Sequence, residues 1–118
     1  MRYMFLIYSQ ESEWDASTSE TQTAVVDSYR DIAREASARG ILEGADELQS
    51  VSTATSVRVR DGKTMITDGP FAETKEQLGG YFVINCENLD EAIEWAQRFP
   101  TARNGIIEIR PIVDNSGA

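Results

Sequence analysis

Short apolar runs and two helical stripes alternate along the chain. Tyr3–Tyr8 and Tyr81–Ile84 are almost entirely apolar, which is typical of strands buried on both faces, since a half-exposed strand would alternate. Ile106–Ile109 predicts a last strand that stops near Arg110-Pro111. The pattern of Ile41–Leu48 is ambiguous and is compatible with a short edge strand.

A hairpin is predicted in the middle of the chain. Thr55–Arg60 alternates polar and apolar residues, and Asp61-Gly62 is a strong signal for a two-residue turn. The turn leads into Lys63–Thr67, which we expect to form the second strand.

Two segments have helical periodicity. The first helix is predicted from Glu20 to Arg39, with Ser19 and Gln22 as its capping box and Gly40 as its stop. Before it, residues 9–18 are expected to form a polar, acidic loop. The second helix is predicted to start at an Asn88 cap matched by Glu91 and to end at Pro100, with one apolar stripe formed by Leu89, Ala92, Ile93, Ala96 and Phe99.

The order β-α-β-β-β-α-β predicts a ferredoxin-like α+β domain with an antiparallel sheet and one additional strand. Residues 1–113 would form this single domain, and the tail 114–118 is expected to fray. Two helices can cover only one face of the sheet, yet the main strands are apolar on both faces. We therefore expect the other face to be covered by the sheet of a second subunit in a homodimer.

Composition and charge narrow the classes of partner. The chain of 118 residues has 20 acidic and 11 basic side chains and a net charge of −9. Nucleic acids and anionic membranes are therefore poor partners, because binding them needs a basic face. A single cysteine, Cys86, and no recognisable signal peptide or long apolar run favour a reducing cytoplasm.

The chain contains no histidine, which removes the usual acid/base at neutral pH and the commonest metal ligand. The acidic residues match no known spacing of a metal-binding loop. We expect neither a metal site nor a cofactor.

The segment from Thr67 to Tyr81 is unusually long for a connection between strands, and long connections are often functional. Its Asp68-Gly69-Pro70-Phe71 core closely resembles the signature of the DGPF group of YCII-related proteins. The resemblance extends over nearly the whole chain, through Tyr3-Met4, Thr55–Asp61, Glu73-Thr74-Lys75-Glu76, Gly79-Gly80-Tyr81, Asp90-Glu91-Ala92 and Glu108-Ile109-Arg110-Pro111.

The resemblance implies a dimeric α+β barrel. YCII-related proteins are often proposed to be enzymes, and DGPF relatives are frequently encoded beside extracytoplasmic-function sigma factors, which makes a sigma factor a candidate partner. The chain departs from the family pattern at Asn104, where many relatives carry a histidine. Asn104 cannot take up a proton at neutral pH, so a mechanism that depends on that histidine is weakened here.

The candidate site centres on Asp68, whose carboxylate could serve as an acid or base. Tyr3, Phe71 and Tyr81 would form the walls of a pocket. Glu73, Lys75 and Glu76 could clamp a small polar ligand, with Lys75 holding an anion and Glu73 orienting a hydroxyl or amine.

Each of these candidate site residues also has a purely structural interpretation. Asp68 could instead bind backbone N–H groups of the turn, and Glu73 and Lys75 could be solvated charges. Phe71 could anchor the core or a dimer interface. Gly79-Gly80 could let a ligand approach the backbone, although such a pair more often supplies a positive φ or a β-bulge. Cys86 favours a buried, inert thiol.

Three hypotheses about function follow. The first is a small-molecule binding or sensing protein with its pocket near the signature loop and the dimer seam. The second is an enzyme of the isomerase or lyase type that uses Asp68 as its acid/base. The third is a protein-interaction module that binds a basic partner through its acidic surface.

Overall fold

Four antiparallel strands form the main sheet in the order β2–β5–β1–β6. They are β1 (Arg2–Ser9), β2 (Leu42–Glu47), β5 (Gln77–Asn85) and β6 (Ile106–Pro111). The computed structural model describes residues 1–116. Its strand order confirms the predicted ferredoxin-like α+β fold, and the ambiguous segment after the first helix is the edge strand β2.

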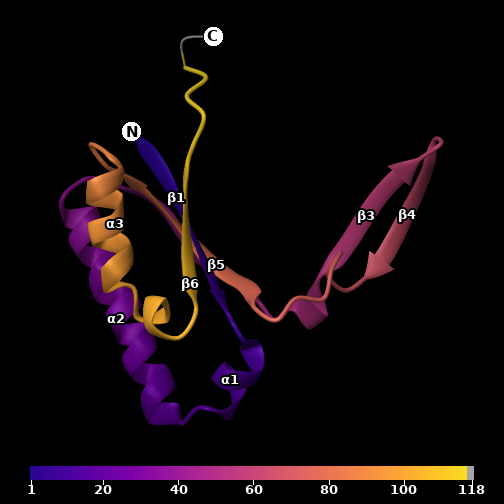
Figure 1. Cartoon of the computed structure of the whole chain (residues 1–118), viewed down its shortest axis with the longest axis horizontal. Coiled ribbons are helices and arrows are strands. Elements are labelled where there is room, and N and C mark those ends of the chain that lie inside the picture. The colour runs from indigo at the N-terminus through magenta and orange to yellow at the C-terminus, as the bar shows by residue number, and fades with distance from the viewer. Residues whose placement is uncertain (117–118) are drawn as a thin grey trace.

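Helices α2 (Ser19–Ala38) and α3 (Leu89–Arg98) lie together on one side of the sheet (Figure 1). A short helix α1 (Glu11–Ala16) and two 3₁₀ turns, η1 (Val51–Thr53) and η2 (Pro100–Arg103), complete the helical elements. No helix within residues 1–116 is long and apolar enough to cross a membrane.

The core between the sheet and the helices is built around four aromatic rings. The Phe99 ring lies 5.5 Å from Phe5, 5.4 Å from Tyr29 and 4.9 Å from Phe82, measured between centroids. These tilted and edge-on geometries are those that aromatic pairs prefer. The rings come from α2, β1, β5 and the end of α3, so they hold both helices on the sheet.

The start of α2 differs from the prediction. Residues 11–16 are helical, because the Gln10 carbonyl accepts hydrogen bonds from the N–H groups of Glu13 and Trp14. The N-cap of α2 is Thr18, whose hydroxyl accepts from the Thr21 N–H at 3.1 Å. The expected capping box does not form, since Gln22 donates its side-chain amide to the carbonyl of Trp14.

Helix α3 starts at Asn88 as predicted, and the Asn88 side chain accepts from the Glu91 N–H at 2.9 Å. Its buried face is rotated from the predicted stripe: Trp95 is buried, whereas Leu89 and Ile93 are exposed. The guanidinium groups of Arg39 and Arg98 lie over the Trp95 ring, and these contacts cover the indole against α2.

The predicted hairpin forms, but outside the main sheet. Strands β3 (Thr55–Arg60) and β4 (Lys63–Asp68) pair only with each other. Asp61 and Gly62 have positive φ angles of 53° and 73°, as a type I′ turn requires. Instead of one additional strand within the sheet, the chain has two strands in a separate arm, which we define as residues 55–68.

The arm extends away from the sheet on the side opposite to the helices (Figure 1). It makes the chain wide: the radius of gyration is 16.4 Å, whereas a compact domain of this length has about 13.5 Å. The arm therefore gains little stability from the rest of its own chain.

Strand β5 is longer than predicted and includes Gly79-Gly80. The register between β1 and β5 shifts at this pair, where Ile7 faces Gly80 and Tyr8 faces Leu78. This confirms the predicted bulge. A Cβ atom on Gly80 would come within 2.8 Å of the Asp46 carbonyl oxygen, so β2 and β5 approach closely here.

The structure describes only part of the segment 114–118, which was predicted to fray. The Asp114 carboxylate accepts a hydrogen bond from the Ser116 N–H at 2.9 Å, and residues 117–118 lie outside the described residues.

Candidate functional site

The sheet has one face without helices, which we call the open face (Figure 1). Alternation along β1 turns Tyr3 and Phe5 toward the helices and Met4, Leu6 and Tyr8 toward the open face. The open face lies on the same side of the sheet as the arm.

One row of the open face crosses all four strands. Leu6 on β1 pairs with Tyr81 on β5 and with Glu108 on β6, and Tyr81 pairs in turn with Asp46 on β2. Residues paired in register project to the same face of a sheet. Two carboxylates, Asp46 and Glu108, therefore stand at the two ends of a row whose middle is apolar.

Each carboxylate of the row accepts a hydrogen bond from a tyrosine. The Tyr81 hydroxyl donates to Asp46 Oδ2 at 2.6 Å, and the Tyr8 hydroxyl donates to Glu108 Oε1 at 3.2 Å. The bond to Asp46 raises the pKa of Tyr81. Burial, followed by the charge of Glu108, raises the pKa of Tyr8. Both phenols thus remain protonated donors at neutral pH, beside carboxylates with free acceptor positions.

The next row forms an apolar floor with a cation at its edge. Met4 pairs with Val83 on one side and with Arg110 on the other. Val83 is buried, Met4 is partly buried and Arg110 is exposed. The ion pairs of the described residues include none between Arg110 and Glu108, and Glu108 instead accepts a hydrogen bond from Tyr8.

The Tyr81–Asp46 pair lies on β5 and β2, and the Tyr8–Glu108 pair lies on β1 and β6. Tyr81 and Glu108 lie two strand spacings apart, about 9–10 Å, with Leu6 between them. A small organic molecule resting on Leu6 and Met4 could therefore reach hydrogen-bonding groups at both ends.

Two of the predicted pocket walls lie on opposite faces of the sheet. Tyr81 is on the open face, whereas Tyr3 is buried on the helix side, with its hydroxyl 3.4 Å from the sulfur of Met1. Within a single chain they do not line one pocket.

The other predicted site residues belong to the arm and the loop after it, and all four are exposed: Asp68, Phe71, Glu73 and Lys75. Asp68 ends β4 at the base of the arm, opposite Thr55. Phe71 is 84% exposed, so it does not anchor the core of its own chain. The structure does not bring these side chains to Tyr81 within one chain.

The turn at the signature is held by backbone and serine groups. The Gly69 N–H donates to the Ala54 carbonyl at 2.7 Å, and the Ser56 hydroxyl donates to the Gly69 carbonyl at 2.8 Å. Gly69 has a φ of 103°, a conformation that favours glycine. Among the hydrogen bonds of residues 1–116, none involves the Asp68 carboxylate, so the structural role considered for Asp68 has no contact to support it.

Sequence reasoning missed the two carboxylates of the row, Asp46 and Glu108, and also Tyr8, which donates to Glu108. For Glu108 the signal was the alternation within β6, where Ile107 and Ile109 face the helices and Glu108 between them does not. Asn104 is exposed at the end of η2.

Cys86 is buried, and burial raises the pKa of its thiol, which agrees with the inert role expected for it. Within residues 1–116, no three histidine, cysteine, aspartate or glutamate side chains come together in a way that could hold a metal ion.

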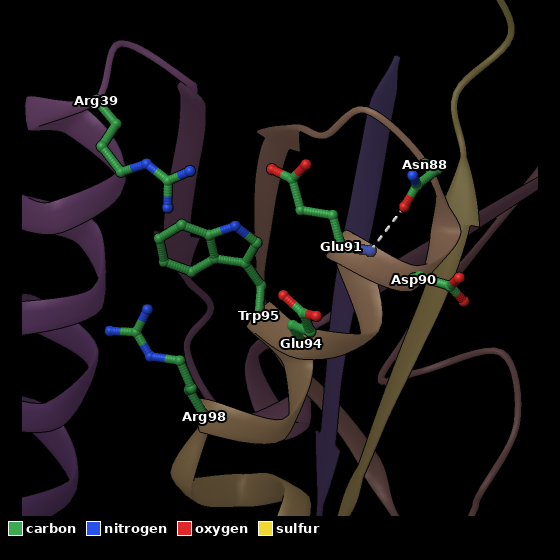
Figure 2. A pocket seen from close by; sticks show the side chains of 7 residues that line it. All are labelled: Arg39, Asn88, Asp90, Glu91, Glu94, Trp95 and Arg98. Carbon is green, nitrogen blue, oxygen red and sulfur yellow. Dashed lines mark hydrogen bonds between the residues drawn. The ribbon is translucent and has the colours of Figure 1, made fainter.

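A polar groove of about 480 Å³ lies on the helix side, where the end of α2 meets α3 (Figure 2). Arg39 and Arg98 flank the indole of Trp95 there, and the acidic side chains come from α3. Arg98 also pairs with Glu35 through two hydrogen bonds of 2.5 and 3.2 Å. Since these charged groups already join α2 to α3, we assign the groove a structural role.

The ion pair between Arg98 and Glu35, beside this groove, predicts a pH dependence of stability. Hydrogen bonding from Arg98 lowers the pKa of Glu35 below its ordinary value of 4.5. Because this holds only in the folded protein, the pair stabilises the fold at neutral pH, and its contribution is lost as the pH falls below 4.5 through the folded pKa. We expect Glu35→Gln to flatten the dependence of the free energy of unfolding on pH in that acidic range, measured by urea denaturation.

The matched control is Glu94→Gln in the same groove, because Glu94 has no ion pair among the described residues. Its pH profile should run parallel to that of the wild type. Equal slopes for wild type and Glu35→Gln would contradict the assignment.

Comparison with known proteins agrees with this architecture. A family model described as the YCII-related domain matches residues 1–116. An uncharacterized protein of Rhizobium meliloti (strain 1021) is 36% identical over 114 residues, which is 95% of this chain and 92% of that protein. The match runs through both the sheet and the arm, and the chain therefore belongs to the YCII-related domain family.

Proposed function

We propose that the protein binds a small organic molecule on the open face of its sheet, without a cofactor. The observation that carries this proposal is the row Asp46–Tyr81–Leu6–Glu108, in which two oriented carboxylates flank an apolar centre. Binding sites for small molecules combine apolar walls with a few placed polar groups, and this row has both.

The chemistry of the row favours a ligand with an apolar body and a cationic or hydrogen-bond-donating end. Asp46 and Glu108 can only accept hydrogen bonds when ionised, and the chain has a net charge of −9. A small primary or secondary amine meets these requirements. Arg110, at the edge of the floor, could hold an acidic group on the same molecule.

A second copy of the chain would complete this site. A molecule lying on a single flat sheet stays largely exposed, whereas ligand sites bury about 70–90% of a ligand's surface. We propose a homodimer in which the second chain covers the open face, so that the ligand is enclosed between the two chains. The apolar side chains on that face, Met4 and Leu6, are only partly buried within one chain, as an interface between subunits requires.

The test is a screen of small amines by thermal unfolding, followed by titration of the hits against variants. A ligand that binds the folded state raises the unfolding midpoint in a concentration-dependent way. Tyr81→Phe removes the hydroxyl that orients Asp46, and a hydrogen bond to a charged group is worth about 1.5–3 kcal/mol. We therefore expect affinity to fall about 10-fold to 100-fold.

Tyr3→Phe is the matched control, because the same atom is removed on the opposite face of the sheet. It should leave the affinity for the hits unchanged. A screen without any saturable shift would count against the proposal, as would hits that bind Tyr81→Phe as tightly as the wild type.

A further inference from the structure

The arm has two chemically different faces. In its register Val57 pairs with Ile66 and Val59 with Thr64, so these side chains share one face. The alternate pairs, Arg58 with Met65 and Arg60 with Lys63, share the other face. The arm is therefore a ribbon with an apolar side, formed by Val57, Val59 and Ile66, and a basic side, formed by Arg58, Arg60 and Lys63.

The apolar side has no partner in its own chain. Val57, Val59 and Ile66 are 60%, 58% and 68% exposed, and Phe71 in the following loop is more exposed still. A two-stranded hairpin alone in water is marginally stable at best. A long, apolar and exposed ribbon of this kind indicates a surface made for contact with another molecule.

Charge and position favour a second copy of this chain as the other molecule. Between Thr55 and Asp68 there are three basic and two acidic side chains, in a chain whose net charge is −9. The arm is thus attracted to the acidic remainder of another copy. It also extends on the side of the open face, where Met4 and Leu6 are only partly buried by their own chain.

The loop after the arm lacks a contact that a second chain can supply. One carboxylate oxygen of Glu76, Oε2, is buried without a hydrogen-bond partner within residues 1–116. Leaving a buried charged oxygen unpaired is costly. A hydrogen-bond donor from a second chain would satisfy this oxygen.

We infer that two copies exchange their arms, and that each arm lays its apolar side on the open face of the partner. Reciprocal exchange of one element about a two-fold axis is a common way to form a dimer. It would bring the partner's Asp68 and the partner's Phe71 to the rim of the row that contains Tyr81. The inference extends the proposed function, since the site would be assembled from two chains.

The experiment places the photoreactive residue p-benzoylphenylalanine at Ile66 in the full-length chain. Its matched control carries the same residue at Arg58, on the opposite side of the arm. After irradiation of the purified protein we expect the Ile66 sample to give covalent dimers joined to residues 2–9, 77–85 or 106–111 of the other chain. The Arg58 sample should give at least fivefold less of this product. Equal yields, or cross-links of Ile66 confined to its own chain, would overturn the inference.

A second pair of variants measures the strength of the contact. Ile66→Lys places a charge on the apolar side, whereas Met65→Lys adds the same charge to the basic side. We expect Ile66→Lys to weaken dimerisation at least tenfold in analytical ultracentrifugation and Met65→Lys to change it less than twofold. A wild-type chain that remains monomeric at 100 times the concentration used for the ligand titration would contradict arm exchange.

The two proposals fail separately. If Ile66 cross-links to the open face of the partner but no amine binds, arm exchange stands and the proposed ligand class is wrong. If amines bind with the expected loss in Tyr81→Phe while Ile66 forms no covalent dimer, the ligand site stands and the exchange is wrong.

Discussion

Replacing Phe99 with alanine is expected to lower the free energy of unfolding by about 3–5 kcal/mol. Phe99 is completely buried, and its ring touches the rings of Phe5, Tyr29 and Phe82. The substitution removes all three aromatic contacts and leaves a cavity. Since the neighbouring rings belong to different elements held by the sheet and by α2, they cannot all move in to fill it.

The measurement is urea denaturation followed by far-UV circular dichroism at one fixed protein concentration, because dimerisation would make stability depend on concentration. Leu89→Ala, at the exposed start of α3, is the control and should cost less than about 1 kcal/mol. Similar losses in both variants would contradict the central position of Phe99 in the core.

The elements of the main sheet could be predicted from the sequence because their signals are local. Apolar runs, the Asn88 cap and the Asp61-Gly62 turn each act over a few residues, and the order of strands and helices then leaves few topologies. The helix α1 had no such signal: it has only six residues, and groups distant in the sequence hold its start. The Glu11 N–H donates to the Gln77 side chain, and the Glu11 carboxylate accepts from the Val51 N–H.

The position of the arm could not be predicted from the sequence, because its two strands do not pair with the main sheet of their own chain. The alternation of Thr55–Arg60 indicates one buried and one exposed side, and that pattern is the same whether a strand joins the sheet of its own chain or covers another. Only the structure shows that β3 and β4 pair with each other alone.

The candidate site was predicted in part. Tyr81 lies in the row on the open face, but its partner Asp46 comes from the edge strand whose identity was ambiguous. Tyr3 and Tyr8 both belong to one apolar run, and only the odd or even position along β1 decides which face each side chain meets. The prediction that this run is buried on both faces did not distinguish the side chains that face the helices from those on the open face.

The second large effect is expected at Gly105, immediately before β6. A Cβ atom there would overlap the carbonyl oxygen of Tyr8 and come within 2.9 Å of the Thr101 methyl group. The Tyr8 carbonyl is backbone of a paired strand and cannot rotate away. We expect Gly105→Ala to lower the free energy of unfolding by about 3 kcal/mol, the upper end of the usual cost of overpacking.

The same change should also weaken ligand binding, because the clash pushes β6 away from β1 at the point where Tyr8 pairs with Ile106. Displacing β6 separates the Tyr8 hydroxyl from Glu108, which are joined by a 3.2 Å hydrogen bond. Gly44→Ala in β2 is the matched control, since an added Cβ meets nothing within 4 Å. It should leave stability unchanged or raise it by up to about 1 kcal/mol. If Gly105→Ala is as stable as Gly44→Ala, β1 and β6 are less tightly joined than the structure indicates, and the row across the open face is not a rigid platform for a ligand.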